Sequence, residues 1–453
     1  MSFVGLYTGL SGIRASQTGI DTVSHNVANA NTPGYTRQRV ELTPAHSYQS
    51  PAGKIGTGVQ VEDIHRLRDQ FLDDRFRAAV ADGEQAGVRA DFLSSLEELT
   101  GEPDEGVSMR LDRLWDAMET WSNDPDDNAS RTQVLTEIAS VAEASRITAD
   151  GWGRLANDYS ERRDTVIEQA NAKLAEIHDL DRRIGNADPS RIGPELLDQR
   201  DMLVDDLAST VGVEGRIAED GTVELTLDGQ QINGFDEPAE LSLDGGEVQL
   251  TADGDTTEVT GAVGGELSGI QAALTEDLPQ WRGELDDFAA GFADALNGVN
   301  EDAGGDALVG FEDPGDIAGT IVLASEDPDV LVASVDGPGA PPHDATNAEN
   351  FADLRTEAVA FPDGGQRTIA DRFADLSVGL GGAVNSELTR AEGAANVAMG
   401  AQLARDAEHG VSLDEEMVDL VRYQRSLESS SRVMTTVDEA LDTLINRTGL
   451  VGR

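Results

Sequence analysis

The chain has 453 residues, no cysteine and a formal net charge of −53 at pH 7. This length allows about two to four compact domains, and the lack of cysteine excludes disulfides, thiolate catalysis and cysteine-ligated metals. A surface this negative repels phosphate backbones, and no apolar run approaches the length of a bilayer span, so we expect neither a nucleic-acid partner nor a membrane partner.

The first predicted element is a helix over residues 3–28. Its large apolar residues follow the spacing of a coiled-coil seam: Phe3, Leu6, Leu10, Ile13, Ile20 and Val27. A second row, of small residues, runs beside the seam: Gly5, Gly9, Gly12, Ser16 and Gly19. Each interior glycine weakens an isolated helix by up to about 1 kcal/mol. We therefore expect this helix to form by packing closely against a partner.

The middle of the chain is predicted to be helical, with one β-rich insert. A short strand is expected at 56–61, and helices are expected over 64–99, 107–121, 130–184 and 194–209. Residues 211–261 are rich in Gly, Asp, Val and Thr and alternate in polarity at Val223, Leu225 and Leu227, which predicts strands. A helix at 278–299, a strand at 320–324 and helices from 348 onward complete this part.

The final helix is the clearest predicted element. Ser412 and Glu415 have the spacing of a capping box at its start. Its seam residues keep heptad spacing and then shift register: Leu413, Met417, Leu420, Leu427, Met434, Val437, Leu441 and Leu444. Because both ends of the chain carry a coiled-coil pattern, we expect the two terminal helices to pair.

These elements predict a mainly α fold with a β-rich insert, arranged as a multi-domain rod. The expected division has three parts: a terminal coiled-coil domain of 1–45 with 405–453, a helical middle domain of 46–210 with 345–404, and a β-rich outer insert of 211–344 that contains one helix.

No pattern in the sequence indicates catalysis, a cofactor or a metal. The six histidines are scattered without ligand spacing, and no phosphate-binding loop, dinucleotide fingerprint or nucleophile elbow occurs. The acidic pairs at 73–74 and 205–206 are expected on solvated helix faces. We therefore expect no enzyme.

Residues 26–37, NVANANTPGYTR, resemble the N-terminal signature shared by flagellar rod, hook and hook-associated axial proteins. The asparagines suit a turn after a helix, and Pro-Gly suits a chain reversal. The turn residues are Asn26, Asn29, Asn31, Pro33, Gly34 and Tyr35.

Further stretches resemble the hook-associated branch of this family. They are 56–59 continuing to 66–73, the LLDQRD motif at 196–201, and the C-terminal stretches 413–416, 431–433, 437–439 and 441–446. The motif at 196–201 has no counterpart known to us in rod proteins. The insert matches the family only loosely and is short for it.

The resemblance implies a structural subunit that joins hook to filament and self-assembles through its terminal helices into a helical homo-oligomer. It also implies the hook protein, other hook-associated proteins and an export chaperone as partners. Its location would be the extracellular flagellum, reached without a cleaved signal peptide. The alternatives are another axial subunit of distal rod or hook type, or a secreted enzyme or adhesin on an axial scaffold. The acidity fits either a saline habitat or lineage bias.

Overall fold

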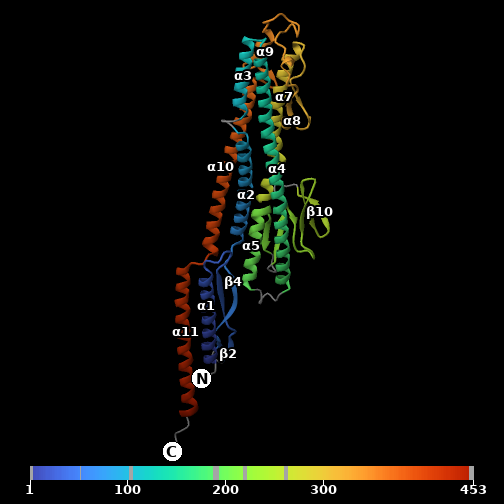
Figure 1. Cartoon of the computed structure of the whole chain (residues 1–453). Helices are drawn as coiled ribbons and strands as arrows, with labels where there is room; N and C mark the ends of the chain where they lie inside the picture. Colours follow the sequence, from blue (N-terminus) through green and yellow to red (C-terminus); the bar gives the residue numbers. More distant parts are fainter. Residues whose placement is uncertain are drawn as a thin grey trace, which may run out of the picture. The chain divides into compact units, whose positions relative to one another are not determined.

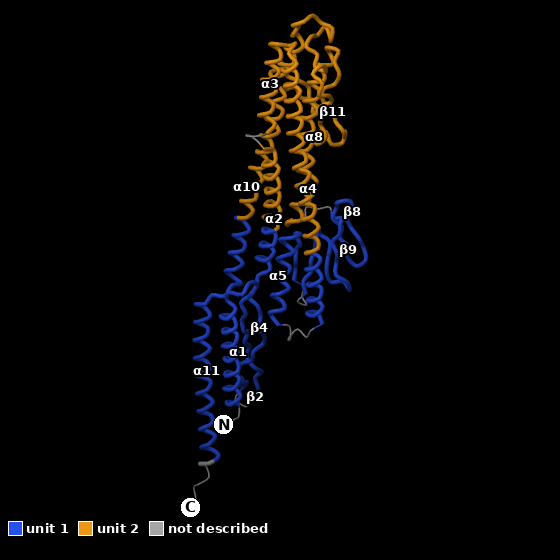
Figure 2. The backbone as a smooth tube through the Cα atoms, in the orientation of Figure 1, with its two compact units in different colours: residues 1–80, 170–263, 396–453 blue, residues 81–169, 264–395 orange. Residues whose placement is uncertain are grey.

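The computed structural model describes residues 4–50, 53–101, 106–186, 193–217, 222–259 and 264–447. The chain is 66% helical with small sheets, which confirms the predicted mainly α class with a β-rich insert. It divides into two compact units, shown in Figure 2: unit 1 is 1–80, 170–263 and 396–453, and unit 2 is 81–169 and 264–395. No helix among the described residues is long and apolar enough to cross a membrane.

The predicted division into a terminal coiled-coil domain, a helical middle domain and a β-rich outer insert is not tested by these two units and stays a prediction. Three long helices, α2 (Gln70–Leu99), α4 (Asn128–Gly185) and α10 (Ile369–His409), contribute residues to both units. Each unit is therefore built from chain segments that are distant in sequence.

Unit 2 is a helical assembly around an aromatic core. Besides its parts of α2, α4 and α10, it contains α3 (Val107–Asn123), α6 (Gly265–Ala272), the π-helical turn η2 (Ala273–Asp277), α7 (Leu278–Asp302), α8 (Ile317–Thr320), the 3-10 turn η3 (Pro328–Val330) and α9 (Thr346–Asp353). Its strands form two antiparallel pairs, β11 (Val309–Phe311) with β12 (Ile321–Leu323) and β13 (Val359–Ala360) with β14 (Gln366–Arg367). Phe288 and Phe373 are fully buried and meet edge to face at 5.1 Å.

Unit 1 contains the two terminal helices and most of the strands. The terminal helices are α1 (Val4–Asn29) and α11 (Leu413–Asp442), which continues into the π-helical turn η4 (Thr443–Arg447). Strands β1 (Gln38–Pro44) and β4 (Val59–Arg66) form an antiparallel pair, and β2 (Tyr48–Ser50) with β3 (Gly53–Ile55) extends the connection between them. Helix α5 (Pro194–Val211) leads into the predicted insert.

Residues 214–258, the first part of the predicted insert, form two three-stranded antiparallel sheets. One is ordered β5 (Glu214–Ile217), β6 (Val223–Leu227), β7 (Gln230–Gln231), and the other β8 (Glu240–Asp244), β9 (Glu247–Ala252), β10 (Asp255–Glu258). Val223, Leu225 and Leu227 are buried and the residue between the first two is exposed, as the alternation predicts.

Two local predictions were wrong. The helix expected from residue 64 begins at Gln70, because residues 64–66 belong to β4 and their backbone pairs with β1. Ser412 does precede α11, but its side chain makes no capping hydrogen bond. Glu415, the other half of the expected capping box, instead forms an ion pair with Arg37.

Helices α1 and α11 pack side by side and run antiparallel (Figure 1). The contact lies on the small-residue row of α1. A Cβ atom on Gly5 would lie 3.1 Å from Val437, one on Gly9 would lie 2.7 Å from Met434, and one on Gly19 would lie 2.5 Å from the ring of Tyr423. The glycines therefore set how closely the two terminal helices approach.

We expect Gly19→Ala to loosen this pair. The added methyl group has no room against the Tyr423 ring, so α11 should lose protection in hydrogen–deuterium exchange. Gly87→Ala in α2 is the matched control, because no atom lies within 4 Å of its Cβ position. There, alanine should stabilise the helix by up to about 1 kcal/mol. Equal protection of α11 in both variants would contradict the close contact.

Candidate functional site

The terminal helix pair contains the residues that the sequence predicts as an assembly interface. Leu6, Leu10, Ile13, Ile20, Leu420, Leu427, Met434, Val437 and Leu441 are half-buried, and Phe3 lies outside the described residues. Met434 and Val437 contact the glycine row of α1. Leu413 and Met417 are each 53% exposed, and Val27 and Leu444 are also exposed. The structure thus brings only part of this set together, and a role between subunits stays a prediction.

The residues of the family motif form a polar turn centred on Asn26. The Asn26 side chain is buried, and its Nδ2 donates to the Gln38 carbonyl at 2.9 Å and to Glu416 Oε2 at 3.0 Å. Its Oδ1 accepts from the Gln38 amide at 3.0 Å and from the Tyr35 hydroxyl at 2.7 Å. One asparagine therefore ties the end of α1 to the start of β1 and to α11.

The rest of the motif shapes the chain reversal. The Asn29 side chain donates to the His25 carbonyl at 3.0 Å, and Asn31 and Pro33 are exposed. Gly34 has φ +74°, and a Cβ there would lie 2.1 Å from Met202 Sδ, so both the backbone and the space require glycine. Burial raises the pKa of Tyr35, and nearby carboxylates raise it further, so its hydroxyl remains a donor.

A buried carboxylate holds the first turn of α11. Glu416 is 1% exposed, and its Oε1 accepts from Arg37 Nε at 2.7 Å. Arg37 also reaches Glu415 at 2.5 Å, and its backbone amide donates to the carbonyl of His409, the last residue of α10, at 3.0 Å. The start of β1 is thus bound to the end of one C-terminal helix and the beginning of the next.

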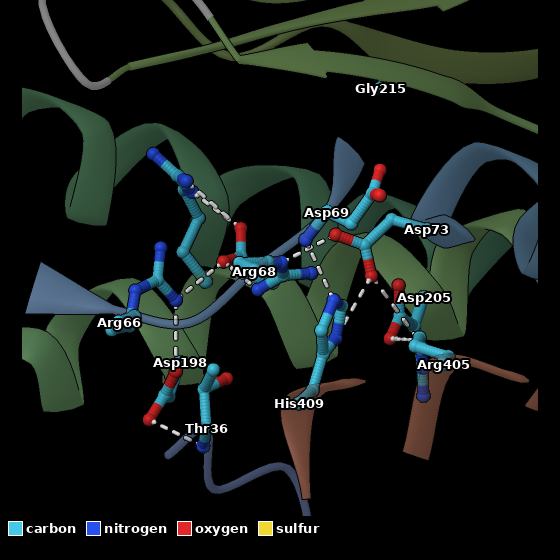
Figure 3. Close-up of polar contacts among 12 residues, drawn as sticks. Thr36, Arg66, Arg68, Asp69, Asp73, Asp198, Asp205, Gly215, Arg405 and His409 are labelled. Atoms are coloured by element: carbon cyan, nitrogen blue, oxygen red, sulfur yellow. Dashed lines mark hydrogen bonds and ion pairs between the residues drawn. The ribbon is translucent and has the colours of Figure 1, made fainter. Parts of the chain in front are cut away.

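A second cluster joins β4 and α5 through Asp198 and Asp201 (Figure 3). Arg66 Nη1 donates to both carboxylates at 2.8 Å, and Asp198 also accepts from the Thr36 amide at 3.2 Å. Asp201 accepts as well from Arg68 and, at 2.9 Å, from the fully buried Arg200. The two motif stretches 66–73 and 196–201 are therefore the two halves of one ion-pair network.

The network extends to α2 and the end of α10. Arg68 Nε donates to Asp73 at 2.5 Å. Asp205 accepts from Arg77 at 2.7 Å. It also accepts from Arg405 at 2.6 Å, a contact that Figure 3 shows. His409 Nε2 accepts from the Asp69 backbone amide at 2.8 Å, also drawn in Figure 3.

The prediction that the acidic pairs lie on solvated faces was wrong for one member of each pair. Asp73 is 2% exposed, and the Asp205 side chain is 20% exposed, because each faces guanidinium groups from other elements. Periodicity alone does not show these partners. The sequence did offer one indication of these partners: Arg37, Arg66 and Glu416 all lie within the stretches that carry the family resemblance.

Asp201 is the most highly paired carboxylate of the network. Burial acts to raise its pKa, but Arg68, Arg200 and Arg66 outweigh burial and lower the pKa from 3.8 to about 2. Its folded pKa is therefore below the unfolded value. The stability it contributes is present above pH 3.8 and is lost as the pH falls through about 2.

We expect Asp201→Asn to lower the free energy of unfolding by about 3–5 kcal/mol, because it leaves buried guanidinium groups without their counter-charge. Asp206→Asn on the same helix is the control; its carboxylate is exposed and, within the described part of the chain, pairs only with Lys173 at 3.7 Å. It should cost less than about 1 kcal/mol. Urea denaturation at neutral pH measures both. Equal costs would show that the network does not stabilise the fold.

His409 should make unit 1 sensitive to mild acid. Burial lowers its pKa from 6.5; Arg68 and Arg405 lower it further, while Asp73 and Asp69 oppose the shift. Because the folded pKa is depressed, this contribution is full above pH 6.5 and is lost as the pH falls through the folded pKa. His409→Gln keeps an acceptor for the Asp69 amide, so its stability should fall less than the wild type between about pH 7.5 and 5. Parallel pH profiles would contradict this role.

Three sequence families match the chain. Residues 93–307 match the flagellar hook-associated protein FlgK helical domain, residues 408–447 the flagellar basal body rod FlgEFG protein C-terminal family, and residues 6–36 the flagella basal body rod protein family. The two terminal matches cover most of α1, the motif turn and α11.

Relatives match over nearly the whole chain. Flagellar hook-associated protein 1 of Bacillus subtilis (strain 168) is 29% identical, over 100% of this chain and 99% of the relative. The protein of the same description from Escherichia coli (strain K12) is 22% identical, over 96% and 98%. The flagellar hook junction protein FlgK from Burkholderia pseudomallei has a similar fold, with a TM-score of 0.64 at 13% identity, covering 75% of this chain and 100% of that chain.

The helical-domain match favours the hook-associated branch over a distal rod or hook subunit, whose families match only the two ends. The near full-length similarity to relatives from two bacteria agrees with this. Together, the family models, the relatives and the similar fold support an assignment of this chain to flagellar hook-associated protein 1, within the flagellar rod, hook and hook-associated axial proteins.

Proposed function

We propose that this chain is a structural subunit at the junction between hook and filament, and that it assembles through the pair α1–α11. The observation that carries the proposal is the packing of the two chain ends on each other through the glycine row. This contact leaves several large apolar residues exposed, among them Leu413 and Met417. Exposed apolar residues on a helix favour contacts between molecules.

The buried polar contacts that centre on Asn26, Glu416, Asp198 and Asp201, together with the arginines that pair with these carboxylates, form what we call the polar clamp, and this clamp suits a mechanical role. Asn26 and Arg37 hold the start of α11, and Asp198 and Asp201 hold the β4 strand that packs beside α1. Buried ion pairs resist separation because each charge that loses its partner remains in a medium of low dielectric. A force on the terminal pair is therefore passed to α5 through short ionic contacts.

The assembly that we propose is a helical homo-oligomer. Its interface would comprise the predicted set Leu6, Leu10, Ile13, Ile20, Val27, Leu413, Met417, Leu420, Leu427, Met434, Val437, Leu441 and Leu444, together with Phe3. Partners would include the hook protein, other hook-associated proteins and an export chaperone. We place the subunit on the flagellum, exported through the flagellum's own channel, with the three-part division as its radial shells and 211–344 outermost.

The proposed role is structural and not catalytic. Asp73, Asp201 and Glu416 are buried carboxylates of unit 1, and each forms an ion pair with at least one guanidinium group. Their arrangement stabilises the fold.

Deletion of the gene, followed by electron microscopy of the cells, tests the function. We expect hooks without filaments and unpolymerised filament protein in the medium, because the filament would lack its junction. A plasmid copy of the gene should restore filaments, and that strain is the control. Normal filaments on the deletion strain would refute a junction role.

A further inference from the structure

The outer face of the first half of α11 carries a groove of ≈ 510 Å³. Its lining consists of Met417, Val418, Val421, Arg422 and Arg425, which are the apolar and cationic residues of consecutive turns. Val418 is 68% exposed. The groove is thus an apolar surface with two guanidinium groups and no carboxylate among its lining residues.

This charge is unusual for the chain, which has 86 acidic and 33 basic residues. Among the described residues, Arg425 forms no ion pair, and Arg422 pairs only with Asp419 on its own helix, at 3.3 Å with its side chain 61% exposed. By contrast, Arg66, Arg68 and Arg200 have side chains at most 11% exposed, and each forms an ion pair with Asp201. Arg425, and the exposed part of Arg422, are therefore open to a carboxylate from outside the molecule.

The second half of the same helix has the opposite character. Glu439 and Asp442 are three residues apart, the same spacing that separates Arg422 from Arg425, and both are exposed. No lysine or arginine occurs from Val433 to Asn446, and Val433 is 47% exposed. This half of α11 is an acidic and partly apolar segment that matches the groove in charge and spacing.

The two halves cannot meet within one molecule. At about 1.5 Å of rise per residue, Arg422 and Glu439 are about 25 Å apart along the helix axis. An ion pair between these residues therefore requires two copies of the chain. Such a contact joins different surfaces of the two copies, and repetition of that kind of contact produces an open array.

We propose that the groove at residues 417–425 of one copy binds the acidic segment 433–442 of α11 in a second copy. The inference rests on the proposed function, since it names the chemistry by which the terminal pair recognises the next subunit. Two strongly negative chains repel each other over most of their surfaces. The groove is a place where exposed guanidinium groups and apolar side chains offset that repulsion.

Charge reversal in the deletion strain tests the pairing. Arg422→Glu with Arg425→Glu, or Glu439→Arg with Asp442→Arg, should abolish filament growth because each places like charges opposite each other. The four substitutions together should restore filaments by re-forming the pairs with reversed polarity. The control is Arg113→Glu with Arg154→Glu, which makes the same change of net charge at exposed arginines that form no ion pair with any described residue, and it should leave filaments unchanged.

Purified variants must keep the wild-type circular dichroism and melting curve for their phenotypes to count. Filaments on either charge-reversed strain would overturn the proposal. Folded protein with all four substitutions that fails to restore filaments would overturn it too. If the deletion strain itself keeps its filaments, the proposed function fails, and cross-linking then decides the pairing separately.

The chain has no cysteine, so Val421→Cys with Thr436→Cys introduces the only thiols. These positions lie about 22 Å apart along one helix, beyond a short bismaleimide linker. In isolated flagella, or in concentrated purified protein, the linker should produce dimers and longer ladders of this chain. Monomers alone, or adducts exclusively with a different protein, would overturn a second copy as the occupant.

Discussion

Asp201 lies where three guanidinium groups meet, and the arrangement of unit 1 depends on that meeting. Arg66 and Arg68 come from the end of β4 and the connection to α2, whereas Arg200 is its neighbour on α5. None of these charges is stable in a buried position without the others. The carboxylate therefore fixes which strand end faces which helix, and the hydrogen bond from Thr36 to Asp198 extends this order to the motif turn.

Arginine is well suited to pairing with buried carboxylates. Its planar guanidinium donates to two carboxylates at once, as Arg66 does to Asp198 and Asp201, and it stays charged when buried. The chain has only two lysines, Lys54 and Lys173, so nearly all its positive charge is in this form. Several of these arginines lie where carboxylates come together, and many of the other acidic residues are exposed at the surface.

The parts of the fold that were predictable from sequence are those decided by periodicity. The long helices and the alternation of β6 follow from repeated local patterns, and their bounds differ little from expectation. The start of α2 was mispredicted because the backbone of residues 64–66 pairs with β1, and this partner strand lies outside the local sequence pattern. Asp73 and Asp205 were misassigned for the same reason, since their guanidinium partners come from other elements.

In the terminal helix pair, the sequence pattern predicted the pairing of α1 with α11 but did not show which residues make the contact. The sequence showed a heptad seam and a glycine row on α1, and it favoured the seam as the contact. In the structure the glycines face α11, because small residues allow the closest approach. Once that face is used, residues such as Met417 and Val421 lie outside the pair. The heptad pattern therefore indicated that α11 has more than one apolar face.

Salt acts unequally on the two sets of charges that result. Exposed groups such as Arg425 and Glu439 are screened over a Debye length of about 8 Å at physiological ionic strength, whereas the network around Asp201 is largely shielded from ions. Rising salt therefore relieves the repulsion between whole molecules while leaving the clamp intact. It also weakens any exposed ion pair between copies, so the apolar floor formed by Met417, Val418 and Val421 has to supply the attraction that persists. A carboxylate-rich chain can thus keep its fold by burying its arginines, and associate by leaving a few of them beside exposed apolar side chains.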